Sequence, residues 1–300
     1  MGKLDGKVAV VTGSGRGIGR GIVTLMAQEG AKVVVNDLGA SVDGEGQDTG
    51  PAQQVVDEIT AAGGQAVANT NNIATVEGGE ALIQTAVDSF GSLDILVNCA
   101  GILRDRMIFN MSEEEWDAVV AVHLKGHFCT IRPASALMRQ QKGGRIINFS
   151  SGSALGAPGQ PNYAAAKAGI LGLTYSCANA LKKYGVTCNA ILPGAATRMT
   201  DTIPANFAQQ MGLTESSETA QEQASPMDPA NVAPIVVFLA SDDAQEVTGQ
   251  AFGASGYRIS VYTHLEPEKT IYSPGPWDLD HLFKVFKGTL GSHLNPPRML

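Results

Sequence analysis

The chain has 300 residues, of which 44% are hydrophobic and 17% charged, and its formal net charge at pH 7 is −8. This composition allows a large core, and the acidic balance argues against nucleic acid or an anionic membrane as the main partner. No apolar run reaches the ~18–20 residues that span a bilayer, and the first residues contain no signal-peptide core. We therefore expect a cytoplasmic protein. Its cysteines lack metal-binding spacing and are expected to be inert thiols: Cys99, Cys129, Cys177 and Cys188.

A repeated alternation of strands and helices runs through most of the chain. A strand expected at residues 7–12 breaks into the glycine-rich turn G-S-G-R-G-I-G, and a helix and a second strand at residues 32–37 follow. A strand, a turn, a helix and a strand at this spacing form a βαβ unit, whose strands are parallel. Further strands are expected at residues 65–69, 94–98, 145–149, 186–192 and 249–253. The pattern predicts an α/β, single-domain Rossmann fold with a doubly wound, seven-stranded parallel sheet.

Three segments interrupt or extend this alternation. Residues 38–50 form a loop rich in glycine and acidic residues, and residues 197–228 form a polar segment beyond the carboxyl end of a strand. Ligands bind at that edge of such sheets, so we interpret the second segment as a substrate lid; a surface excursion is the alternative. We assign residues 1–256 to one domain. Residues 257–300 are a C-terminal extension with an apolar stripe at helical spacing, which we place at a subunit interface of a homodimer or homotetramer.

Tyr163 and Lys167 lie four residues apart in an alanine-rich run. Alanine favours a helix, and a helix brings residues i and i+4 onto one face. The Lys167 ammonium is therefore expected to lower the pKa of the Tyr163 hydroxyl, which makes it a usable acid or base near pH 7. Ser150 ends the preceding strand and is a candidate to hold a substrate oxygen against Tyr163. The alternative is a surface Tyr–Lys pair on an ordinary helix, and the rest of the chain decides between the two.

The glycine turn and Asp37 indicate a dinucleotide site. Glycines let the backbone approach a pyrophosphate, whose charge the start of the following helix favours. Asp37 ends the second strand, eighteen residues after Gly19, where a carboxylate binds the ribose hydroxyls of NAD and repels the 2′-phosphate of NADP. Arg16 would favour that phosphate, but Asp37 carries more weight because its charge would face the phosphate directly. We expect NAD rather than NADP; the alternative for Asp37 is a turn residue that only ends the strand.

Ordered motifs across residues 5–255 resemble the short-chain dehydrogenase/reductase family: the T-G-x-x-x-G-x-G turn, an N-C-A-G run, Ser150, the Y-x-x-x-K pair and a later P-G pair. The resemblance implies an NAD(P)-dependent oxidoreductase that acts on alcohols and carbonyls. It implies that Tyr163 is the general acid/base, that Lys167 binds the nicotinamide ribose, and that Ser150 orients the substrate oxygen. Tyr163 and Lys167 thereby also contact the cofactor. The other implied cofactor-binding residues are Gly13, Ser14, Arg16, Gly17, Ile18, Gly19, Asp37, Leu38, Asn71, Asn72, Ile73, Asn98, Ala100, Gly101, Pro193, Gly194, Ala196 and Thr197.

A narrower resemblance, to one branch of the family, is carried by the segments V-V-N-D-L-G, A-V-A-N, G-I-L-R-D-R, V-H-L-K-G and A-T-R-M-T. The branch includes the (3R)-hydroxyacyl-CoA dehydrogenase unit of the multifunctional β-oxidation enzyme. It implies NAD-dependent oxidation of a 3-hydroxyacyl-CoA or, alternatively, of a steroid or other free secondary alcohol. His123 stands where most of the family has a relay Asn and where this branch tends to have His. A CoA ester carries phosphates, so Arg104, Arg106 and Arg198 are candidates to bind them, although solvated arginines fit equally well.

Other functional classes have weaker support. His123 and His127 lie four residues apart on the long helix that a capping box at Ser112 and Glu115 opens, but no third ligand is evident, so we expect no metal. No G-x-S-x-G elbow supports a hydrolase. A regulatory protein that binds a dinucleotide without catalysis is the remote alternative. Such proteins typically lose the tyrosine or the lysine, and both residues are present here.

Overall fold

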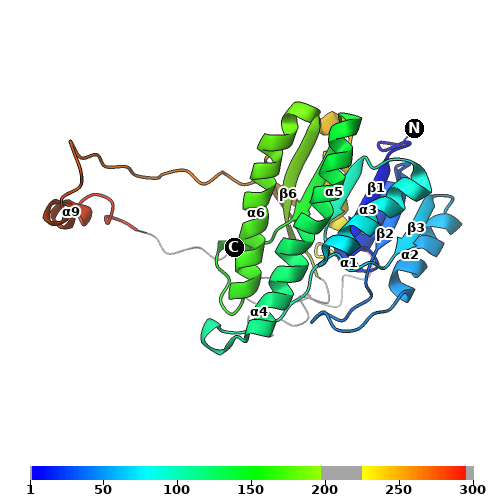
Figure 1. Cartoon of the computed structure of the whole chain (residues 1–300), viewed down its shortest axis with the longest axis horizontal. Helices are drawn as coiled ribbons and strands as arrows, with labels where there is room; N and C mark the ends of the chain where they lie inside the picture. The colour runs from blue at the N-terminus through cyan, green and yellow to red at the C-terminus, as the bar shows by residue number, and fades with distance from the viewer. Residues whose placement is uncertain (1, 197–224, 295–300) are drawn as a thin grey trace.

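A computed structural model describes residues 2–196 and 225–294. Its centre is one sheet of eight strands in the order β3-β2-β1-β4-β5-β6-β7-β8 (Figure 1). The strands are β1 (Val8–Thr12), β2 (Lys32–Asn36), β3 (Gln65–Asn69), β4 (Ile95–Asn98), β5 (Gly144–Phe149), β6 (Val186–Gly194), β7 (Ala251–Ser255) and β8 (Arg258–Val261). Strands β1 to β7 are parallel, and β8 pairs antiparallel with β7. The predicted doubly wound sheet of seven parallel strands is confirmed, and an eighth strand extends it.

Helices cover both faces of the sheet and bury two apolar clusters. One face packs against α1 (Gly17–Gln28), α2 (Gly50–Ala61) and α8 (Ala233–Ala240). The other face packs against α3 (Val76–Phe90), α5 (Gly126–Gln141) and α6 (Pro161–Leu181). Because successive strand residues point to opposite faces, Ala9 and Val11 of β1 enter the first cluster, whereas Val8 and Val10 enter the second. A parallel sheet that is covered on both faces requires this apolar run in its central strands.

The predicted long helix after Ser112 is divided into three parts. The capping box is present, since the Ser112 hydroxyl accepts from the Glu115 backbone and the Glu115 carboxylate accepts from the Ser112 backbone. Helix α4 (Glu113–Val120) then passes through a π-helical turn, η2 (Ala121–Lys125), into α5. Such turns insert an extra residue into a helix and often occur at functional sites. The short 3₁₀ segments are η1 (Ile108–Asn110), η3 (Gly152–Leu155), η4 (Lys182–Tyr184), η6 (Pro229–Val232) and η7 (Asp242–Ala244).

Polar side chains lie in register at the carboxyl ends of the central strands. Thr12 is paired with Asn36 on one side and with Asn98 on the other, and Asn98 is paired with Asn148. All of these side chains are buried. The Asn98 amide donates to Asn148 Oδ1 at 3.0 Å, and Thr130 of α5 donates to Asn98 Oδ1 at 2.7 Å. This row closes the apolar core and forms the floor of the edge at which ligands of such sheets bind.

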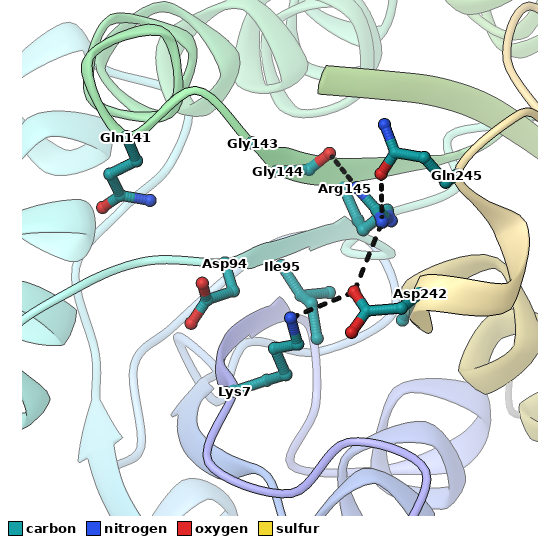
Figure 2. Close-up of a pocket in the computed structure, with 10 residues that line it drawn as sticks. Lys7, Asp94, Ile95, Gln141, Gly143, Gly144, Arg145, Asp242 and Gln245 are labelled. Atoms are coloured by element: carbon teal, nitrogen blue, oxygen red, sulfur yellow. Dashed lines mark hydrogen bonds and ion pairs between the residues drawn. The ribbon is translucent and has the colours of Figure 1, made fainter. Parts of the chain in front are cut away.

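A small cavity of about 160 Å³ lies at the opposite, amino-terminal edge of the sheet (Figure 2). Several of its polar lining groups contact one another: Lys7 Nζ lies 3.0 Å from Asp242, and the Arg145 guanidinium donates to Gln245 Oε1 at 2.7 Å. Arg145 also donates to the Ser241 carbonyl at 3.1 Å. These contacts fasten the start of β5 to the turn after α8. The cavity is therefore a structural junction, remote from the edge that binds ligands.

The C-terminal extension begins inside the sheet rather than after it. Strand β8 lies within residues 257–300, and Tyr262 donates its backbone N–H to the Ala251 carbonyl at 2.8 Å. Beyond it an extended arm leads to α9 (Leu279–Phe286), which lies apart from the sheet and its helices (Figure 1). Most of the predicted lid falls outside the described residues, which resume at Ser225. Over the described ranges, no helix has the length and apolarity to cross a membrane.

Candidate active site

The glycine turn after β1 requires the absence of side chains. Gly13 has φ +65°, and a Cβ there would lie 2.6 Å from the Ala100 Cα. A Cβ at Gly19 would lie 2.3 Å from the Gly13 carbonyl oxygen, so α1 begins in direct contact with the turn. The Ser14 hydroxyl is buried and donates to the Val11 carbonyl at 2.7 Å. Gly17 begins α1, whose first turn contains no acidic residue. The turn therefore presents backbone N–H groups and a helix start to an approaching phosphate.

Asp37 is fixed beside this turn at the end of β2. Its Oδ2 accepts from the Gly15 backbone N–H at 2.9 Å, and its Oδ1 accepts from the Gly39 backbone N–H at 2.8 Å. A Cβ at Gly15 would lie 2.8 Å from the same carboxylate. Arg16 is the N-cap residue of α1 and has an extended backbone. The glycine turn and the fixed carboxylate together fit the pyrophosphate and one ribose of a nicotinamide dinucleotide.

The residues predicted for the adenine end lie after β3. The Asn36 amide donates to the Asn71 carbonyl at 3.1 Å, which holds this loop against β2. The Asn72 side chain is exposed, and its Oδ1 accepts from the Ala74 backbone at 2.9 Å. Ile73 is buried in the second apolar cluster. Asn72 can therefore offer a ligand the N–H groups of its amide, while Asn71 and Ile73 shape the loop.

The residues predicted for the nicotinamide end follow β4 and β6. The Ala100 backbone donates to the Thr12 hydroxyl at 3.1 Å, and a Cβ at Gly101 would lie 2.4 Å from the His123 ring. Asn98 is buried in the polar row beneath them, so it supports this loop from below. Pro193 and Gly194 end β6, and the Ala196 backbone donates to the Met227 carbonyl. The prediction for Thr197 lies outside the described residues.

Helix α6 brings Tyr163 and Lys167 together as their spacing predicts. The Lys167 ammonium lies 5.3 Å from the centre of the Tyr163 ring and donates to the Phe149 carbonyl at 2.6 Å. The serine that forms a hydrogen bond with the Tyr163 side chain is Ser151. Ser150 is 1% exposed, and its hydroxyl donates to the Lys167 carbonyl at 2.8 Å. This geometry favours Ser151 over the predicted Ser150 as the serine that holds a substrate oxygen, because the Ser150 hydroxyl is bonded to the Lys167 carbonyl.

The electrostatics of the pair differ from the expectation drawn from the sequence. Burial raises the pKa of Tyr163 to about 12, although the hydrogen bond from Ser151 acts in the opposite direction. Burial also lowers the pKa of Lys167 from 10.5 to about 8. The Tyr163 pKa is therefore raised and not lowered as the Tyr–Lys spacing predicted, because removal of the phenol from water dominates. The ammonium is directed at the Phe149 carbonyl rather than at the phenol oxygen.

His123 packs against the catalytic tyrosine candidate from the π-helical turn. Its ring meets the Tyr163 ring edge-on at 5.0 Å, and its Nε2 lies 2.8 Å from the Ile102 carbonyl oxygen and 3.1 Å from the Ile102 nitrogen. Burial, followed by the nearby charge of Lys167, lowers the pKa of His123 well below its usual range. The neutral ring therefore positions Tyr163 and the loop after β4. Nδ1 has no hydrogen-bond partner among the residues that the structure describes.

His127 does not form a metal site with His123. Its Nδ1 lies 2.6 Å from the His123 carbonyl oxygen, which ties the two residues along the helix. Burial lowers the pKa of His127 to about 3, so this ring is also neutral. Within the part of the chain that the structure describes, no group of three or more His, Cys, Asp or Glu side chains could hold a metal ion.

Comparison with known proteins assigns the family. The family of short chain dehydrogenases matches residues 7–208 of the chain. The chain belongs to the short-chain dehydrogenase/reductase family. A solved short chain dehydrogenase from Mycobacterium avium is 46% identical, with a TM-score of 0.83, and the match covers 100% of this chain and 99% of that chain. The family exchanges a hydride between a hydroxyl or ketone group and a nicotinamide dinucleotide, so this chain is an oxidoreductase that binds such a cofactor.

Two curated relatives of the same family carry more specific names. The hydroxyacyl-CoA dehydrogenase ChsB1 of Mycobacterium tuberculosis is 44% identical over 92% of this chain and 86% of its own length. The peroxisomal multifunctional enzyme type 2 of Mus musculus is 43% identical over 82% of this chain. The chain spans only 31% of the mouse enzyme, which therefore has further parts with no counterpart in the matched region. The resemblance to this branch of the family is confirmed.

The strand pattern of the sequence contains a signal that distinguishes the two adjacent serines. Ser150 follows Asn148 by two residues, and alternation along a strand directs both side chains to the same face. Asn148 donates to Thr174 of α6 at 3.0 Å, and Ser150 donates to Lys167 of the same helix.

Proposed function

We propose that this protein oxidises a 3-hydroxyacyl-CoA to the 3-oxoacyl-CoA with NAD⁺. The observation that carries the proposal is the cluster of Tyr163, Ser151 and Lys167 at the carboxyl edge of the sheet, next to the glycine turn and Asp37. The names of the mycobacterial and mouse relatives support a hydroxyacyl thioester as the substrate. A 3-hydroxyl group on an acyl chain is a secondary alcohol, which this cluster is equipped to hold and deprotonate.

Each member of the cluster has a defined task in the proposed reaction. Ser151 donates to the substrate oxygen and holds it beside Tyr163. The Tyr163 phenolate takes the hydroxyl proton while the C–H bond breaks and the C=O bond forms. A nicotinamide dinucleotide, when bound in its oxidised form, would supply the hydride acceptor and a positive charge, which would favour the phenolate against its burial. Lys167 adds a second positive charge, and its ammonium is held by the Phe149 carbonyl.

Asp37 supports the choice of NAD over NADP. Both carboxylate oxygens accept backbone N–H groups, from Gly15 and from Gly39, so the side chain cannot turn aside easily. A 2′-phosphate at the adjacent ribose would meet this fixed negative charge, whereas two ribose hydroxyls would donate to it. Arg16, at the helix start, is the candidate counter-charge for the phosphate.

The arginines predicted to bind CoA phosphates are already paired. Arg104 lies 3.4 Å from Glu114 and 3.8 Å from Glu45, and Arg106 lies 2.8 Å from Glu115. A carboxylate partner competes with a phosphate for the same N–H groups. Arg198 lies outside the described residues. This pairing favours a second candidate substrate, a free secondary alcohol such as a steroid, for which no phosphate contact is needed.

We further propose a homodimer or homotetramer in which residues 257–300 contribute to the interface. Exposed apolar side chains on the arm and on α9 support this, since Leu279 is 68% and Phe283 75% exposed. Removal of residues 266–300 is expected to reduce the number of subunits per particle in solution, as calculated from the measured mass. An unchanged number of subunits would contradict the proposal. A reducing compartment such as the cytoplasm is favoured by the free cysteines Cys99, Cys129, Cys177 and Cys188.

The substrate and cofactor are tested together by NADH or NADPH formation. A (3R)-3-hydroxyacyl-CoA and a free secondary steroid alcohol are each assayed in separate reactions with NAD⁺ and with NADP⁺ at equal concentrations. Turnover of the thioester with NAD⁺ alone is the expected result. Turnover of the free alcohol only would replace the substrate and leave the mechanism unchanged, and equal rates with both cofactors would contradict the role of Asp37.

A further inference from the structure

Residues 38–49, named the strap here, form a closed loop after β2. The Asp48 backbone donates to the Leu38 carbonyl at 3.0 Å, which joins the two ends of the loop. Inside it, the Ser41 backbone donates to the Glu45 carbonyl at 2.9 Å. A Cβ at Gly39 would meet the Asp48 carbonyl, so the closed base needs glycine at that position, where φ is +74°. The strap is therefore an ordered loop held by its own internal hydrogen bonds.

The tip of the strap is fastened to the loop after β4. The Leu103 backbone donates to the Val42 carbonyl at 2.9 Å. The Arg104 Nε donates to the Asp43 carbonyl at 2.8 Å. The same guanidinium reaches Glu45 of the strap at 3.8 Å and Glu114 of α4 at 3.4 Å. Its side chain is only 18% exposed, whereas the side chains of Glu45 and Glu114 are 73% and 85% exposed.

The sheet order places the fastened strap across the dinucleotide groove. Strands β2 and β4 lie on either side of β1, and all three end at the same edge. The strap leaves from the end of β2 and is held by the loop that follows β4. It must therefore pass the intervening end of β1, from which the glycine turn at 13–19 leads into α1. In Figure 1 the segment after β2 runs along the lower edge of the molecule, beneath the ends of these strands.

We propose that the strap encloses the bound dinucleotide and that Arg104 is the positioning residue that keeps it closed. The inference rests on the proposed function only in that the groove holds a nicotinamide dinucleotide. With the strap fastened at both ends, a dinucleotide that lies along the carboxyl edge leaves only when the contacts of Arg104 and Leu103 break. Arg104 thereby controls cofactor release without touching the reacting atoms. The Arg104 guanidinium contacts Glu45, Glu114 and the Asp43 carbonyl, and these contacts hold the strap closed. In this proposal the guanidinium does not bind a substrate phosphate.

Dissociation of NADH from the full chain, followed by its fluorescence after rapid mixing with excess NAD⁺, tests the inference. Arg104→Ala is expected to release NADH about tenfold faster than the wild type, because charge-assisted contacts that favour the closed strap are lost. Arg104→Lys keeps the positive charge and is expected to fall between the two. Arg106→Ala is the matched control: its partner Glu115 lies on α4 and not on the strap, so NADH release is expected to stay unchanged.

A second variant is designed to slow NADH release instead of speeding it. It keeps Arg104, so it does not require the protein to fold without that side chain. Val42→Cys together with Leu103→Cys places two thiols at a backbone contact between the strap and the loop. Oxidation is expected to slow NADH release, and a reductant is expected to restore it. Unchanged release in both Arg104→Ala and the oxidised cysteine pair would overturn the inference, as would an equal effect of Arg106→Ala. A wild-type chain that binds no NADH would instead overturn the proposed function, and the inference with it.

Discussion

At the residue scale, two adjacent serines have different surroundings and are expected to respond differently to substitution. Ser151→Ala removes the hydrogen bond to Tyr163, and kcat/KM is expected to fall about hundredfold, as for loss of one donor to developing charge. Ser150→Ala removes a buried bond to the Lys167 carbonyl, and the free energy of unfolding is expected to fall by about 1 kcal/mol. Steady-state kinetics and urea unfolding of both variants provide the test. A larger fall in kcat/KM for Ser150→Ala than for Ser151→Ala would show that Ser150 is the serine that holds the substrate oxygen.

Lys167 makes the stability of the protein depend on pH. Its pKa is about 8 in the folded protein against 10.5 in the unfolded chain, so the unfolded chain binds the proton more tightly. Between these values the unfolding free energy contributed by this group rises with pH, and below pH 8 the buried charge costs up to about 3 kcal/mol. Lys167→Met removes the charge. The advantage of this variant in unfolding free energy is expected to be largest near pH 7 and to shrink as the pH rises from 8 to 10.5.

Urea unfolding of wild type and Lys167→Met at several pH values from 6 to 10 measures this difference. Tyr163 is present in both proteins, so its own titration contributes equally to each and cancels in the difference between them. A difference between the two proteins that does not change with pH would show that the Lys167 pKa is not lowered.

The Tyr–Lys pair itself follows from helical spacing. The direction of the tyrosine pKa could not be predicted, because burial is set by chain segments distant in sequence.

At the element scale, strand β8 was missed because it is short and its side chains are exposed. Residues 258–261 alternate between polar and apolar side chains over only four positions, and the strand is specified by pairing with β7 and by Tyr262, which packs against Ala190, Leu192 and Ala251. The break in the long helix was missed for a related reason. The π-helical turn is fixed by contacts of His123 with Ile102 and Tyr163, which sequence periodicity does not contain.

The boundary of the folded domain can be tested by truncation. A chain ending at residue 265 keeps β8, Tyr262 and the contact of His264 with the Gly249 carbonyl at 2.7 Å. A chain ending at residue 256 loses them and exposes the edge of β7. We expect the chain ending at residue 256 to unfold at a midpoint lower by roughly 5 °C or more than the chain ending at residue 265. Equal midpoints of the two truncated chains, measured by circular dichroism, would contradict a structural role for β8.

At the scale of the whole molecule, much of the site could be predicted because a parallel sheet collects the ends of its strands at one edge. The glycine turn, Asp37, Gly101 and Tyr163 come from distant parts of the chain, yet each follows a predicted strand or opens a predicted helix. The fastening of the strap by Arg104 could not be foreseen. It depends on a loop-to-loop contact across the end of β1, and a single sequence does not reveal which acidic groups an arginine will meet.

The central claim is that Tyr163 performs the proton transfer at a site that binds the cofactor independently of it. The most direct measurement compares Tyr163→Phe with the wild type in turnover of a (3R)-3-hydroxyacyl-CoA and in the dissociation constant for NADH. We expect turnover to fall at least 10³-fold while the NADH dissociation constant changes by less than about threefold, because only a transition-state interaction is lost. Retained turnover would contradict the account. Loss of NADH binding together with turnover would show that the ring holds the site together instead.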